Sequence, residues 1–186
     1  LNVSSELMGM AVLRSDTGER LGEVADVVVH PTEGSVLGIS VRTPEDTERV
    51  LYTMDFSIGA DAVMAAEGAR FDDEELTGAL AKGVYALSEL IGTNIVTQNG
   101  RLLGRISEVH VSIDTPRAIY RVAGSTMQRF FGRGFFISGD VPHAYSHQGV
   151  RLIVPANTED HYAVQSLREA ITGRGRTTPQ EEAGRS

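Results

Sequence analysis

With 186 residues, 41% of them hydrophobic, the chain has room for one medium domain or two small ones that bury an apolar core. It contains no cysteine, which excludes disulfides, thiolate metal sites and cysteine nucleophiles. The net charge of −8 is uneven, because residues 1–86 carry 6 Lys+Arg and 16 Asp+Glu whereas residues 87–186 carry 11 and 9.

The first half of the chain reads as a series of short strands. An opening strand at residues 2–4 leads to the corner Ser5-Glu6-Leu7-Met8-Gly9. A hairpin with arms at 10–14 and 21–30 follows, and its turn contains Gly18, which can take a left-handed conformation. Alternating apolar residues then predict strands at 36–43, 49–54 and 62–65.

The second half repeats this series. Ser5, Glu6, Leu7 and Gly9 return as Ser88, Glu89, Leu90 and Gly92, while Gly18, Leu21, Gly22, Val24 and Val27 return as Gly100, Leu103, Gly104, Ile106 and Val109. Asp26 is matched by Glu108, and Asn99-Gly100 is a strong signal for a tight hairpin turn. The repeat indicates two copies of one module, each expected to fold around its own core.

The apolar residues after each turn predict a bulged strand. Leu21, Val24 and Val27 follow in steps of three, whereas a regular strand alternates every second residue. A helix also gives steps of three, but it rarely begins one residue after a hairpin turn, and the valines at 27–29 favour a strand. We expect Gly22 and Gly104 at the bend, where a side chain would clash.

The motif Ser-Glu-Leu-x-Gly, followed by Leu-Gly-x-Val/Ile-x-Asp/Glu-Val-x-Val, resembles the PRC-barrel domain that the reaction-centre H subunit and the ribosome maturation factor RimM share. The resemblance covers residues 2–70 and 84–156. It implies an all-β fold of two tandem small barrels, at 1–71 and 84–158, joined by a short linker helix at 72–83. A short C-terminal helix and a disordered tail are expected at 159–186.

Both helices have sequence support. Acidic residues crowd the start of the linker helix at Asp72 and Lys82 lies at its end, which complements the helix dipole. The C-terminal helix is predicted over residues 159–171, with Tyr162, Val164, Leu167 and Ile171 as its docking stripe. From Gly173 onward the chain is too polar to fold.

We find no catalytic constellation in the sequence. It lacks a phosphate-binding loop and a Gly-x-Ser-x-Gly elbow. His143 and His147, with His161 further on, are the best metal candidates, but their spacing suits a helix and the stretch reads as a loop without a further ligand. We therefore expect surface histidines, no metal, no cofactor and no enzyme activity. His30 and His110 are expected at edge or surface positions.

Residues 125–134 depart from the repeat. They replace an acidic turn at 44–48 with a segment that contains Met127, Arg129, Phe130, Phe131 and Arg133. Aromatic residues and arginine are enriched at the cores of interfaces, so these five residues are the predicted partner-binding site. The alternative is that Phe130 or Phe131 plugs the end of the barrel.

Members of the PRC-barrel family look like docking modules, so the resemblance implies a non-enzymatic adaptor that binds other proteins. The alternative is an RNA- or ribosome-associated assembly factor. The acidic first half disfavours nucleic acid as its ligand, and self-association stays open. No signal peptide is recognisable and no apolar run approaches the roughly 18 residues of a membrane span, so we expect a cytoplasmic protein.

Overall fold

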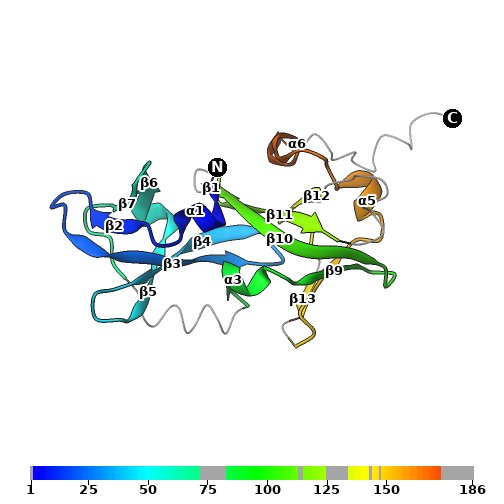
Figure 1. Cartoon of the computed structure of the whole chain (residues 1–186), viewed down its shortest axis with the longest axis horizontal. Coiled ribbons are helices and arrows are strands. Elements are labelled where there is room, and N and C mark those ends of the chain that lie inside the picture. The colour runs from blue at the N-terminus through cyan, green and yellow to red at the C-terminus, as the bar shows by residue number, and fades with distance from the viewer. Residues whose placement is uncertain are drawn as a thin grey trace.

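A computed structural model describes residues 2–71, 83–112, 115–124, 134–142, 144–146 and 148–172 (Figure 1). The expected linker helix lies outside these residues except for its last position, Gly83. The expected tail from Gly173 onward lies outside them entirely.

The first copy is built almost entirely from strands. Its elements are β1 (Asn2–Val3), α1 (Ser4–Leu7), β2 (Ala11–Arg14), β3 (Arg20–His30), β4 (Ser35–Arg42), β5 (Glu48–Tyr52), the 3₁₀ turn η1 (Thr53–Asp55), β6 (Phe56–Ile58) and β7 (Ala62–Ala65). Neighbouring strands run in the order β6-β7-β2-β3-β4-β5, and all pair antiparallel except β7 and β2, which are parallel.

The second copy has the same topology. Its elements are β8 (Tyr85–Ala86), α3 (Leu87–Leu90), β9 (Asn94–Thr97), β10 (Leu102–Ser112), β11 (Arg117–Ala123), β12 (Phe135–Ser138), β13 (Ala144–Ser146) and β14 (Arg151–Val154). The order β13-β14-β9-β10-β11-β12 again contains one parallel pair, β14 with β9. The predicted all-β fold with two tandem copies is confirmed.

The predicted bulge and its glycines are confirmed in both copies. The register slips between Val12 and Leu13 where β2 pairs with β3, and between Leu102 and Gly104 where β9 pairs with β10. A Cβ on Gly22 would lie 2.2 Å from the carbonyl oxygen of Arg42, and one on Gly104 would lie 2.7 Å from that of Gly124. The neighbouring strand therefore passes too close for a side chain.

The opening strands are exchanged between the copies. In β1, Val3 pairs with His110 of the second copy, and in β8, Ala86 pairs with Val28 of the first. Because His110 and Val28 are counterparts in the repeat, the exchange is reciprocal and in one register. We call residues 2–7 the first arm and residues 85–90 the second arm. The expectation that each copy keeps its own opening strand is wrong.

The copies also meet at the starts of β4 and β11, where Ser35 pairs with Arg117. The backbone N–H of Ala118 donates to Gly34 at 2.8 Å, and that of Val36 donates to Pro116 at 3.2 Å. These two bonds are counterparts in the repeat, so the junction has the reciprocal geometry of a two-fold dimer. One continuous apolar cluster contains residues of both copies, so the core is shared.

The C-terminal segment covers one outer face of the second copy. Instead of one helix there are two short ones, α5 (Thr158–His161) and α6 (Leu167–Thr172). Between them, Val164 forms a β-bridge with Phe136, and it packs with Ile119 and Ala170. Ile171, predicted to dock, is 47% exposed, because the break in the helix turns Ala170 inward in its place.

Candidate functional site

The five predicted partner-binding residues, Met127, Arg129, Phe130, Phe131 and Arg133, lie outside the described residues. The strands on either side are described, and Val122 of β11 pairs there with Phe135 of β12. The segment therefore connects two adjacent antiparallel strands, between Gly124 and Gly134. Whether its phenylalanines are exposed or fill the barrel stays a prediction.

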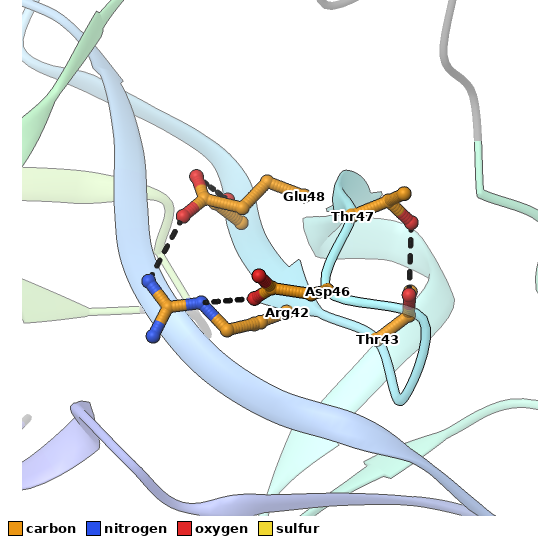
Figure 2. Close-up of polar contacts among 6 residues, drawn as sticks. Arg42, Thr43, Asp46, Thr47 and Glu48 are labelled. Carbon is orange, nitrogen blue, oxygen red and sulfur yellow. Dashed lines mark hydrogen bonds and ion pairs between the residues drawn. The ribbon is translucent and has the colours of Figure 1, made fainter.

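In the first copy, the same connection is the turn at 43–47 between β4 and β5, and Arg42 organises it. The Nη2 atom of Arg42 lies 3.2 Å from Oε1 of Glu48, and its Nε atom lies 3.8 Å from Oδ1 of Asp46 (Figure 2). The hydroxyls of Thr43 and Thr47 share a hydrogen bond of 2.8 Å across the base of the turn. One guanidinium thus holds two carboxylates at the end of the hairpin.

A hollow of about 310 Å³ lies beside this turn. It is lined by Arg20, Gly22, Glu23, Arg42, Thr43 and Pro44. The bulge of β3 forms one wall, and there Arg20 Nε donates to the carbonyl oxygen of Gly22 at 3.5 Å while its Nη2 lies 3.7 Å from Oε2 of Glu23. We call this feature the first-copy hollow. Carboxylates accompany both of its guanidiniums, so it is not an open anion site.

The carboxylates around the first-copy hollow give this end of the molecule a negative character. The two ranges 14–23 and 42–49 together contain six Asp+Glu and four Arg, which gives a net charge of −2. At the tip of the turn, a hydrogen bond from the Thr43 side chain lowers the pKa of Glu45, so this carboxylate is ionised at neutral pH. An incoming guanidinium would therefore meet charged acceptors here.

The second copy differs at the same positions. By strand register, the counterparts of the hollow's lining are Leu102, Gly104, Arg105, Ala123 and Gly124. The glycine at the bulge is kept, whereas the paired charges are lost, and Leu102 is 47% exposed. Residues 97–105 and 123–135 contain four arginines and no Asp or Glu. One of the four arginines, Arg101, pairs with Glu159 of α5. The two ends of the molecule are thus opposite in charge.

The histidines do not assemble a metal site in the described part of the chain. No group of three or more His, Asp or Glu side chains there could hold a metal ion. His161 ends α5 and packs its ring against Tyr162, with the centroids 6.4 Å apart. His143 and His147 lie outside the described residues, so the predicted absence of a metal at that loop stays a prediction.

His110 is buried, contrary to the sequence prediction. Its strand pairs with the first arm at Val3, its ring lies 5.7 Å from that of Phe136, and it is 7% exposed. Its Nε2 atom has no hydrogen-bond partner among the described residues, and the nearest Glu108 oxygen is 3.8 Å away. Burial lowers the pKa of His110, although Glu108 opposes the shift. His30 is half-buried, as an edge position would be.

Asp26, a motif residue without an assigned role in the sequence, connects the two copies. Its Oδ1 accepts hydrogen bonds from the backbone N–H of Val27 at 2.7 Å and of Ser88, in α3, at 3.3 Å. The carboxylate therefore caps the first turn of α3, the helix of the second arm. Its counterpart Glu108 instead pairs with Arg121 at 3.0 Å.

The first-copy hollow was not predicted from the sequence, although a signal for it was present. Arg20 and Arg42 align with Leu102 and Ala123, so a position-by-position comparison of the copies would have marked them. Their proximity could not be read from the sequence, because it depends on the register of β3 against β4 and on the bend at Gly22.

The chain belongs to the PRC-barrel domain family, whose model matches residues 3–70 and 82–161. A structure from Pseudomonas aeruginosa, of a protein assigned as the 16S ribosomal RNA processing protein RimM, is similar at 12% sequence identity and a TM-score of 0.33. That similarity covers 74% of this chain and 99% of the RimM chain. A comparison with curated proteins gives no match. Over the described residues, no helix has the length and apolar character needed to cross a bilayer.

Proposed function

We propose that this chain is a non-enzymatic adaptor that acts in the cytoplasm and binds other proteins through the loops of its PRC-barrel domains. The observation that carries the proposal is an asymmetry within a symmetric scaffold. The copies share topology, bulges and exchanged arms, yet the β11–β12 connection spans residues 124–134 where the β4–β5 connection spans 43–47. A longer loop with two phenylalanines and two arginines is not required by the fold, which supports a role in recognition.

The test replaces Phe130 and Phe131 by alanine in the full chain. We expect the double variant to lose the partners that the wild-type chain captures from its native host, while its melting temperature changes little. Met54→Ala is the matched control, because Met54 is 92% exposed in the first copy and should leave capture intact.

Two results would change the proposal. A large drop in the melting temperature of the double variant would show that the rings fill the end of the second barrel, and the interface would have to be sought elsewhere. Binding of RNA whose affinity falls steeply with salt concentration would favour the alternative, an RNA- or ribosome-associated assembly factor.

A further inference from the structure

We propose that the chain binds a second copy of itself end to end, with residues 125–133 of one molecule docked in the first-copy hollow of the next. The inference rests on the proposed function for the role of this segment, and it adds the identity of one partner.

The junction between the copies sets the geometry. Because β4 and β11 pair antiparallel only near their starts, at Ser35 and Arg117, their far ends at Arg42 and Ala123 point away from each other. The β2–β3 and β9–β10 hairpin turns lie at opposite ends of the long axis in Figure 1. Each strand advances about 3.3 Å per residue, which separates the two ends by roughly 40 Å.

The segment cannot reach the hollow of its own molecule. Its flanking residues, Val122 and Phe135, are paired side by side, so both ends of the segment are held at the same place. Half of the connection at 124–134 extends at most about 20 Å, at roughly 3.5 Å per residue. Contact between the segment and a first-copy hollow therefore requires another molecule.

The two ends are complementary in charge. The end with the hollow has a net charge of −2 from ten ionisable side chains, and the opposite end has four arginines, of which Arg101 pairs with Glu159. Arg129 and Arg133 belong to the docking segment. Glu23 lines the hollow, and Asp46 and Glu48 pair with Arg42, which also lines it. Attraction between these opposite net charges would favour encounter between unlike ends over contact between like ends.

The hollow also suits an aromatic side chain. Its volume of about 310 Å³ lies at the lower limit of small-ligand pockets, enough for one or two side chains. The ring of Pro44 and the stems of Arg20 and Arg42 supply apolar walls. Both arginines line the hollow, and a guanidinium can stack on the ring of a phenylalanine.

The contact is heterologous, since each molecule uses one end as donor and the other as acceptor. Such contacts extend into open chains of molecules unless the geometry closes a ring. Two variants distinguish this arrangement from a symmetric dimer. Phe130→Ala with Phe131→Ala removes the donor, and Pro44→Arg adds positive charge at the rim of the acceptor, on an exposed turn.

The experiment is sedimentation velocity of the purified full chain over a concentration series, at low and high salt. We expect the wild type to associate progressively at low salt and to dissociate at high salt. Each variant alone should weaken association at least tenfold, whereas an equimolar mixture of the two should form 1:1 dimers and nothing larger, because one intact donor and one intact acceptor remain. Ala60→Arg, on an exposed turn outside the hollow, should behave as the wild type.

A wild-type chain that stays monomeric at low salt and high concentration would overturn the inference, and so would normal association of Pro44→Arg. In either case the adaptor proposal would stand if the double variant still lost its captured partners. If the double variant instead unfolds at a much lower temperature than the wild type, both proposals fall together.

Discussion

At the residue scale, His110 is a polar side chain in a place that the repeat fills with an aliphatic one. Its counterpart Val28 is 4% exposed and packs with Val50 and Val84. His110 is 7% exposed and has the same place beneath the opposite arm. The Nε2 atom of the neutral imidazole has no hydrogen-bond partner there among the described residues, which costs stability relative to an aliphatic side chain.

The stability of the chain should therefore depend on pH through His110. Because the folded state lowers the pKa of His110, its titration takes nothing from the stability of the chain above its unfolded pKa of about 6.5, whereas stability is lost as the pH falls below that value and the unfolded state binds the proton more readily. The charged groups that act on it are Glu108, Arg121 and Glu6. We expect His110→Val to raise the free energy of unfolding and to flatten its decline between about pH 7 and pH 5, measured by denaturant unfolding. An unchanged pH profile in the variant would contradict this account.

At the element scale, the arms are held by a cap as well as by strand pairing. Asp26 accepts hydrogen bonds from the backbone N–H of Ser88 and so fixes α3 against β3. Both groups are at least partly buried, and removal of the carboxylate would leave the N–H of Val27 without its acceptor.

We expect Asp26→Ala to lower the free energy of unfolding by about 1–2 kcal/mol, the usual cost of a lost helix cap. Glu108→Ala is the matched control, because this counterpart makes a more exposed ion pair with Arg121 and should cost less than about 1 kcal/mol. Thermal and denaturant unfolding of both variants measures the difference. Equal costs would mean that the carboxylate of Asp26 does not anchor the second arm.

The elements also show how far a sequence can predict this fold. Strands, hairpins and bulges were predictable because their signals are local: the turn glycines, and the three-residue steps from Leu21 to Val27. The exchange of arms was not, because the edge of β3 offers the same backbone groups to an arm of either copy. The burial of His110 was missed as well, because it depends on its packing against Phe136 of a neighbouring strand. For the same reason the first-copy hollow, which forms between β3 and β4, has no local signature.

At the scale of the whole molecule, the two copies form a covalently joined pseudo-dimer. Each copy lends its arm to the other, the junction at Ser35 and Arg117 is reciprocal, and buried residues of both copies belong to one cluster. A small module has little core per residue, and the loss of an arm would uncover part of it. The covalent link keeps the partner copy at a high effective concentration, which stabilises the exchanged state.

Separate fragments should therefore never be folded monomers. We expect residues 1–71 and residues 83–172, expressed apart, to be either unfolded or self-associated. Each fragment contains one arm and one strand edge that binds an arm, but in the whole chain each arm pairs with the strand edge of the other copy. Mixed in equal amounts, they should form a 1:1 complex with the β-type circular dichroism of the intact chain, since the reciprocal pairing of β1 with β10 and of β8 with β3 needs both. Circular dichroism with sedimentation equilibrium tests both statements. A fragment that unfolds cooperatively as a monomer would show that an arm can close on its own copy, and the exchanged arrangement would then be one of two accessible states of the chain.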